Sequence, residues 1–227
     1  MTDDLFSAAA ACLHCRDVAE KLRRARDLPA AVEALPRDTG VSPKAIGEAG
    51  RPERPVLVEP SRLPRRGLGS ALGRAALVHA VAHIEFNAIN LACDALYRFR
   101  DMPDAYYADW ARVAAEEAYH FGLLQRRLGQ LGHAYGDFEA HSGLWDMAVK
   151  TADDALLRMA LVPRVLEARG LDVTPGMMER FAAAGDEETA GILAIILRDE
   201  IGHVQIGSRW FRYLCRHRGL DAESTYL

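Results

Sequence analysis

The stretch AYYADWARVAAEEAYHFGLLQRRLGQLG (residues 105–132) has the periodicity of a long helix and carries a glutamate and a histidine three positions apart. Glu117 and His120 would lie one turn apart on the same face of that helix. The spacing returns in the segment DEIGH, where Glu200 precedes His203, 83 residues after the first pair. Because the chain has only eight histidines, this repetition indicates two related helices that each carry a metal-binding pair.

The segments on either side of these pairs also have helical patterns, and no alternating strand pattern competes with them. Residues 71–100 are apolar nearly all round, which is typical of a buried helix. The turn DMPD, which contains Pro103, separates them from the next helix, and Gly132 is a plausible stop for that helix. The four predicted helices cover residues 71–100, 105–132, 144–169 and 186–217.

The connections between these helices predict how they are arranged. The links 101–104 and 170–185 are short, or contain a short helix, and would join antiparallel neighbours. The link from Gly132 to Gly143 is long enough to cross a bundle. Two helical hairpins joined by one crossover form the layout of a ferritin-like four-helix bundle. The sequence therefore predicts an all-α protein with this bundle as its main domain.

A different composition precedes the predicted bundle. Residues 3–26 favour one helix, and residues 35–69 contain six prolines and five glycines, which favour an irregular arm. Such a long irregular stretch is uncommon inside a compact domain. We therefore expect a helix and arm over 1–70, the bundle over 71–217 and a tail over 218–227.

The predicted hairpins repeat each other in their acidic residues. A di-metal carboxylate site in a bundle takes one glutamate from each of two helices and a Glu-x-x-His from each of the other two. Glu85 precedes Glu117 by 32 residues, and Glu167 precedes Glu200 by 33. Four carboxylates can neutralise and bridge two divalent metals about 3.5–4 Å apart, and the imidazoles leave positions open for O2 or peroxide. The predicted ligands are Glu85, Glu117, His120, Glu167, Glu200 and His203.

The other histidines and the cysteines carry weaker signals. His79 and His83 share a helix face, and we expect them to pack against the N-terminal arm rather than to bind a second metal. Cys12 and Cys15 form a single C-x-x-C, which is weak evidence for zinc or redox chemistry. We interpret them as ordinary thiols of an N-terminal helix, and Cys93 and Cys215 as core residues.

Composition excludes several function classes. The net charge of −4 and pI of about 6.1 provide no basic field to recruit nucleic acid or anionic lipid. No apolar run is long enough to span a bilayer, and the acidic N-terminus lacks the basic region of a secretory signal. Few, scattered cysteines do not form a disulfide scaffold. We expect a cytoplasmic protein with no membrane partner, and the sequence is compatible with a homodimer.

Four stretches carry a resemblance to known proteins: HIEFNAINLACDALYRF, YADWARVAAEEAYHFGLL, LVPRVLEARGLDVTP and DEIGHVQIGSRWF. Over residues 71–217 the chain resembles the ferritin-like di-iron/di-manganese superfamily, and more narrowly an uncharacterised bacterial family of ferritin-like domains. It is similar, in its ligand pattern alone, to the di-iron enzyme that hydroxylates a modified tRNA base. The resemblance implies the bundle fold, the six ligands and two iron ions, or manganese, as cofactors.

Three functions fit this pattern. The first is an oxidoreductase that activates O2 and oxidises, by hydroxylation, a small molecule or an RNA base that the sequence does not identify. The second is a metal-handling or peroxide-consuming protein, such as a ferroxidase or a manganese catalase-like enzyme; a rubrerythrin-like peroxidase is disfavoured because its two C-x-x-C pairs are missing. The third is a helical module with a structural metal.

Overall fold

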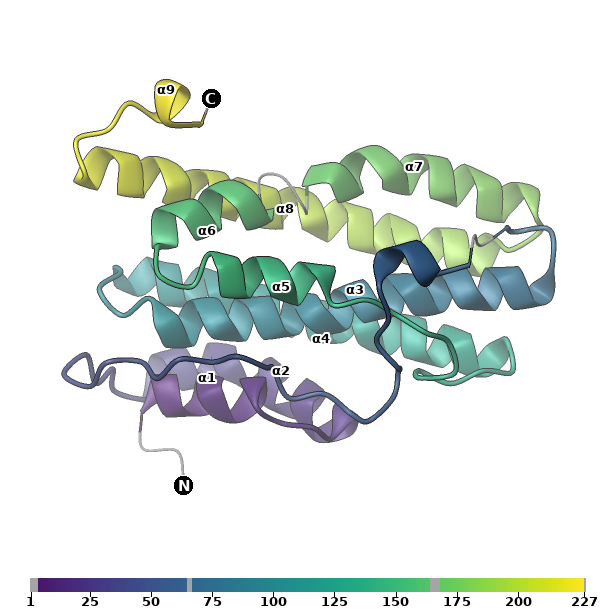
Figure 1. Cartoon of the computed structure of the whole chain (residues 1–227), viewed down its shortest axis with the longest axis horizontal. Helices are drawn as coiled ribbons and strands as arrows, with labels where there is room; N and C mark the ends of the chain where they lie inside the picture. Colours follow the sequence, from purple (N-terminus) through teal and green to yellow (C-terminus); the bar gives the residue numbers. More distant parts are fainter. Residues whose placement is uncertain (1–3, 65–66, 164–167, 227) are drawn as a thin grey trace. The chain divides into compact units, whose positions relative to one another are not determined.

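The computed structural model describes residues 4–64, 67–163 and 168–226, and within these ranges the chain is all-α (Figure 1). The described part contains no strand, and its one isolated β-bridge pairs Leu57 with Ala140. The all-α prediction is therefore confirmed. The helices are α1 (Leu5–Leu13), α2 (Val18–Ala34), the 3-10 turn η1 (Pro60–Arg62), α3 (Ala71–Arg98), α4 (Asp104–Gln130), α5 (Gly143–Lys150), α6 (Ala155–Leu161), α7 (Ala168–Ala183), α8 (Glu187–His217) and α9 (Ala222–Tyr226).

The chain divides into two compact units, Met1–Trp145 and Asp146–Leu227. The first unit contains α1 to α4 and the arm, and the second contains α6 to α9. In the first unit, the N-terminal helices pack directly on the predicted bundle helices: α1 against α3, and α2 against α4. The boundary at residue 70, drawn from the sequence, stays a prediction.

The core of the first unit is the hairpin of α3 and α4, which run side by side (Figure 1). Its two helices begin and end within two residues of the predicted limits. The Ser70 side chain starts α3 by accepting a hydrogen bond from the amide of Gly73 (3.0 Å). Gly132 follows α4 with a φ of +79°, a left-handed conformation that favours glycine and ends the helix as predicted.

The N-terminal region corrects one prediction. Instead of one helix over residues 3–26, it forms α1 and α2, and α2 continues to Ala34. The break follows from Asp17, whose side chain caps the second helix by accepting a hydrogen bond from the amide of Glu20 (2.8 Å). The sequence motif that starts α2 thus outweighs the continuous helical composition.

The arm is irregular as predicted, with η1 as the only helical turn in its described residues. It is held on the first unit by separate hydrogen bonds. The amide of Lys44 donates to the Tyr97 hydroxyl (2.8 Å), and the amide of Gly50 donates to the carbonyl of Leu13 (2.8 Å). A Cβ at Gly50 would lie 2.2 Å from the carbonyl oxygen of His14, so this close approach requires glycine.

The predicted third helix over 144–169 is wrong. Residues 144–163 form α5, a turn and α6, and α7 occupies most of the predicted link 170–185. Asp154 starts α6 by accepting a hydrogen bond from the amide of Leu156 (2.8 Å), which separates it from α5. Gly170, the first residue after the predicted helix, and Pro175 both lie inside α7. In the second unit α6 and α7 both pack on α8, which has the predicted limits within one residue.

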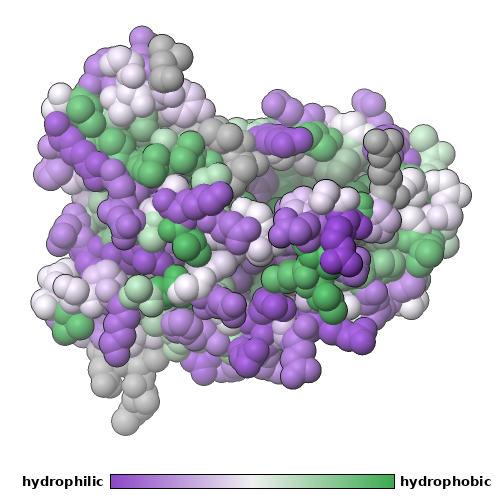
Figure 2. Space-filling view, in the orientation of Figure 1, coloured by the Kyte–Doolittle hydropathy of each residue, from purple (hydrophilic) through white to green (hydrophobic). Residues whose placement is uncertain are grey.

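Most large apolar side chains are buried in this structure. The face drawn in Figure 2 is correspondingly mixed, with hydrophilic side chains spread between smaller apolar groups. Contrary to the expectation from the sequence, α3 is long and apolar enough to cross a membrane, but 83% of its apolar window is buried inside the protein. Burial of that kind is typical of the central helix of a folded core.

Candidate metal centre

The hairpin of the first unit brings three predicted ligands together. Glu85 lies on α3, and Glu117 and His120 lie one turn apart on α4. His120 Nδ1 is 3.2 Å from Glu85 Oε2 and 3.4 Å from Glu117 Oε2. The three side chains each offer a ligand atom, and these atoms lie within 4.8 Å of one another. This geometry makes the cluster a candidate metal site, which we call the α3–α4 cluster.

The three side chains of the cluster are buried. The exposed fraction is 3% for Glu85 and zero for Glu117 and His120. Phe86 and Phe121, which follow the ligands on the two helices, are also buried and pack against each other with ring centroids 5.6 Å apart. Removing carboxylates from water is unfavourable unless positive charge compensates them. The interior therefore contains two acids for which a cation is the natural partner.

The two carboxylates create a negative potential that raises the pKa of His120. Burial alone would lower its pKa, but hydrogen bonds to Glu117 and Glu85, together with their charges, outweigh burial and raise the pKa of His120 to about 11. A proton on the imidazole therefore partly neutralises the carboxylates. A metal ion would occupy the same potential and would take the imidazole in its neutral form.

The second unit contains the other Glu-x-x-His pair on one face of α8. His203 Nδ1 lies 3.6 Å from Glu200 Oε2, and His203 is buried whereas Glu200 is partly exposed. Glu167, the remaining predicted ligand, lies outside the described residues. The structure thus places five of the six predicted ligands: three in the α3–α4 cluster and two on α8.

The helix carrying His203 makes a tight contact four residues later. A Cβ at Gly207 would lie 2.2 Å from Pro163 Cγ and 2.3 Å from its Cβ, so α8 can approach this proline only with glycine there. The contact fixes α8 against the chain just before the undescribed segment that contains Glu167. Glycine at this position had no interpretation from the sequence.

The two histidines of α3, His79 and His83, contact the loop between α4 and α5. His79 Nε2 accepts a hydrogen bond from the amide of Gly136 (2.9 Å), and His83 Nδ1 lies 2.8 Å from the Tyr135 hydroxyl. The expected packing against the N-terminal arm is therefore mainly packing against this loop. Tyr135 also contacts Phe121, at 4.9 Å between ring centroids. Nothing periodic in the loop sequence could have identified this aromatic contact.

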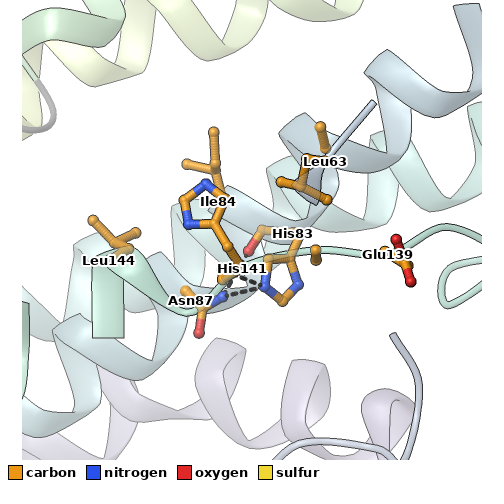
Figure 3. A pocket seen from close by; sticks show the side chains of 9 residues that line it. Leu63, His83, Ile84, Asn87, Glu139, His141 and Leu144 are labelled. Carbon is orange, nitrogen blue, oxygen red and sulfur yellow. Dashed lines mark hydrogen bonds between the residues drawn. The ribbon is translucent and has the colours of Figure 1, made fainter. Parts of the chain in front are cut away.

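A small pocket of about 90 Å³ opens beside His83 (Figure 3). The His83 ring and the Asn87 amide point toward each other, 3.0 Å apart, and Leu63 of the arm lies across the pocket. Burial lowers the pKa of His83 to about 4. Its ring is therefore neutral at pH 7, so this pocket supplies polar groups rather than charge from His83.

The comparisons with known proteins identify a family. Residues 14–227 match the model of a family described as "Protein of unknown function (DUF455)". An "Uncharacterized protein" of Haemophilus influenzae is 55% identical over 185 residues, which are 78% of this chain and 64% of that protein. The chain thus matches somewhat less than two thirds of the relative's length. No solved structure matches significantly. The chain belongs to the DUF455 family.

Proposed function

We propose that this DUF455 member is a ferritin-like di-iron carboxylate oxidoreductase that uses O2 to oxidise, by hydroxylation, an organic substrate. The observation that carries the proposal is the α3–α4 cluster. Two buried carboxylates and an imidazole converge there within 4.8 Å, which is a donor set suited to iron or manganese. The four-helix bundle and the cytoplasmic location of the protein belong to the same proposal.

The remaining proposed ligands, Glu167, Glu200 and His203, are inferred from the repeat in the sequence. The 32-residue and 33-residue spacings pair Glu85 and Glu117 with Glu167 and Glu200. Each half would supply one single glutamate and one Glu-x-x-His, as di-metal bundles require. When bound, the metals would supply redox equivalents and Lewis acidity that side chains lack.

The residues of the α3–α4 cluster have separate roles in this proposal. Glu85 and Glu117 supply the negative charge that holds divalent cations, and His120 supplies a neutral nitrogen ligand after losing its proton. The three side chains are themselves buried, so bulk water is kept away from them. Exclusion of water strengthens the attraction between carboxylate and metal.

A metal analysis with matched variants tests the site. Protein purified without added metal, and protein loaded anaerobically with Fe(II) or Mn(II), should contain two metals per chain. Glu117→Gln should reduce this content to below one per chain, because it removes a charged ligand with little change in shape. Glu116→Gln is the matched control, since Glu116 is the adjacent glutamate of α4 and is not a proposed ligand. His203→Ala tests the second half.

Retention of two metals per chain in both Glu117→Gln and His203→Ala would show that the donor set is wrong. A loss in Glu117→Gln with none in His203→Ala would restrict the site to the first unit. Helical content measured by circular dichroism should stay unchanged in each variant, which separates ligand loss from unfolding.

The reaction class is tested with reduced protein. Anaerobic protein loaded with two Fe(II) per chain should consume O2 and stop once those two irons are oxidised, as followed with an oxygen electrode and a dye for residual Fe(II). Continued oxidation of many added Fe(II) ions per chain would instead identify a ferroxidase. Inertness towards both O2 and peroxide would identify a structural metal. Product formation with candidate metabolites and RNA would then identify the substrate.

A further inference from the structure

A pocket of about 520 Å³ lies between α1 and residues 38–46 of the arm, beside the C-terminal end of α3. Asp4 and Ser7 line it from the side of α1, and Tyr97 and Arg100 line it from the end of α3. Figure 1 shows the arm passing along α1, where the amide of Leu5 donates to an arm carbonyl. We call this hollow the arm pocket. Its volume is within the range of pockets that hold small organic molecules.

Arg100 is held firmly in the arm pocket. Its Nη1 donates to the carbonyl oxygens of Asp38 and Val41, at 3.2 and 2.5 Å, and its Nε donates to that of Tyr97 at 3.2 Å. The guanidinium also lies over the rings of Phe6 and Tyr97, 4.4 and 5.1 Å from their centroids. Nη2 makes no hydrogen bond within the described residues. A guanidinium fixed by neutral carbonyls keeps its positive charge, and this nitrogen keeps its donors for an oxyanion.

Lys44 brings a second cation to the arm pocket. Its backbone amide donates to the Tyr97 hydroxyl (2.8 Å), which holds this part of the arm, and its side chain is exposed. In the described part of the chain, neither Lys44 nor Arg100 forms an ion pair with a carboxylate. The proton of the Tyr97 hydroxyl has no acceptor there either. The pocket therefore offers an ammonium, a guanidinium and a hydroxyl as hydrogen-bond donors.

Two acids also line the arm pocket, but neighbours in the chain engage their oxygens. Asp4 caps α1, and its two oxygens accept hydrogen bonds from the amide and the hydroxyl of Ser7, at 3.0 and 2.8 Å. Asp38 Oδ1 accepts one from the amide of Gly40 (2.9 Å). With two acids and two cations the pocket has no formal net charge. Placed donors, rather than a general positive field, would therefore select its ligand.

Apolar side chains complete the lining of the arm pocket. Ile46 is buried at 6% exposure, whereas Val41 is 58% exposed. An organic molecule in the pocket would remove this valine from water, which is favourable. Apolar surface combined with a few placed polar groups is typical of small-molecule sites.

We propose that the arm pocket binds a small organic anion. Its carboxylate or phosphate group would accept hydrogen bonds from Arg100 and Lys44, and its carbon skeleton would cover Val41 and Ile46. Carboxylate and phosphate share the chemistry that matters here, since both form strong, charge-assisted hydrogen bonds with guanidinium and ammonium groups. Because the arm forms one wall, the bound anion would also tie the arm to α1.

The arm pocket is separate from the α3–α4 cluster. Tyr97 follows Glu85 by 12 residues, which corresponds to about 18 Å along the axis of α3. None of the proposed metal ligands lines the pocket. The proposal therefore does not rest on the proposed metal chemistry, and the two can fail independently.

The three lysines of the chain provide a test, because their surroundings differ. Lys44 lies in the arm pocket, and Lys150 is exposed at the end of α5. Lys21 is buried, with its Nζ donating to Asn90 Oδ1 (2.6 Å). An amine-acetylating reagent should therefore modify Lys44 and Lys150, but not Lys21, in the folded full chain. The rate at each lysine is followed by mass spectrometry of its peptide.

The probes are butyrate, succinate, glycerol 3-phosphate and inorganic phosphate, with butyramide and glycerol as neutral controls at the same ionic strength. At ten times its dissociation constant a probe leaves about one tenth of the sites free. An organic anion that binds should therefore slow the acetylation of Lys44 about tenfold and leave Lys150 unchanged. Protection by butyrate or succinate would identify a carboxylate site, and protection by glycerol 3-phosphate a phosphate site. The neutral controls should protect neither lysine.

Lys44→Gln tests the binding itself by titration calorimetry with the protecting probe. The dissociation constant should rise about tenfold, because a hydrogen bond between charged groups is lost. Lys150→Gln is the matched control and should bind as the wild type does. Equal protection of both lysines, protection by inorganic phosphate alone, no protection by any organic anion at millimolar concentration, or unchanged affinity in Lys44→Gln would each overturn the proposal.

Discussion

Replacing Glu117 by glutamine should abolish the stabilisation of the protein by metal. A ligand that binds only the folded chain stabilises it by about 2.7 kcal/mol at a concentration one hundred times its dissociation constant. For a chain of this length, 1 kcal/mol corresponds to a shift of about 2–4 °C in Tm. Wild-type protein should therefore melt about 5–11 °C higher with Mn(II) than with a chelator, and Glu117→Gln should show almost no shift.

The magnitude depends on where Glu117 lies. Its carboxylate is wholly buried and 3.4 Å from His120 Nδ1, so no solvent-exposed acid can replace it as a ligand. Differential scanning calorimetry with Mn(II) avoids oxidation during heating, and Glu116→Gln serves as the control that should keep the full shift. A wild-type shift that persists undiminished in Glu117→Gln would refute the assignment of this residue to a metal site.

Two further predictions concern the second unit. Gly207→Ala should lower the free energy of unfolding by about 1–3 kcal/mol in urea denaturation, because the added methyl would lie 2.2 Å from Pro163. Gly191→Ala is the control in the same helix, and it should be neutral or stabilising because open space surrounds that position. Asp154 accepts two hydrogen bonds from Arg218, at 2.7 and 2.9 Å, which lower its pKa below the usual 3.8. Its contribution should be present above about pH 4 and lost as pH falls further, and Asp154→Asn should reduce that acid sensitivity; an unchanged pH profile of Tm would contradict this.

The long helices of the chain could be predicted because their information is local. Apolar periodicity, the proline at 103 and the glycine at 132 place α3 and α4 within two residues, and α8 within one. The prediction of one helix over residues 144–169 was wrong because a helix-starting residue lies within its apolar pattern. Asp154 begins a new helix within an apolar pattern, and Gly170 and Pro175 are accommodated inside α7, because tertiary context overrides local helix propensity.

The α3–α4 cluster could be predicted for a related reason. A spacing of three within a helix places Glu117 and His120 on one face whatever the tertiary structure, and hairpin symmetry then suggests Glu85. The contact between Lys21 and Asn90 has no such local signature, because 69 residues separate them. Such a contact depends on how α1 and α2 pack on the hairpin of α3 and α4, which periodicity alone does not determine.

The α3–α4 cluster also allows a structural ion pair to be distinguished from a metal site. One Nδ1–H of His120 is shared between two carboxylates, at 3.2 and 3.4 Å. Protonated His120 with Glu85 and Glu117 carries a net charge of −1 in the core, whereas one carboxylate with the imidazolium would be neutral. Burying a second carboxylate beside the same imidazolium adds a desolvation cost that a single acid would not incur.

The metal-free stability of Glu117→Gln follows from this imbalance. The variant loses one hydrogen bond to a charged group, worth about 1.5–3 kcal/mol, but it also loses a buried negative charge whose desolvation is unfavourable by several kcal/mol. We therefore expect metal-free Glu117→Gln to be at least as stable as metal-free wild type in urea denaturation. A clear decrease in its free energy of unfolding would instead indicate that the second carboxylate stabilises the fold without metal. The proposed metal site predicts the first outcome, because a bound cation rather than the stability of the fold would then account for the second carboxylate.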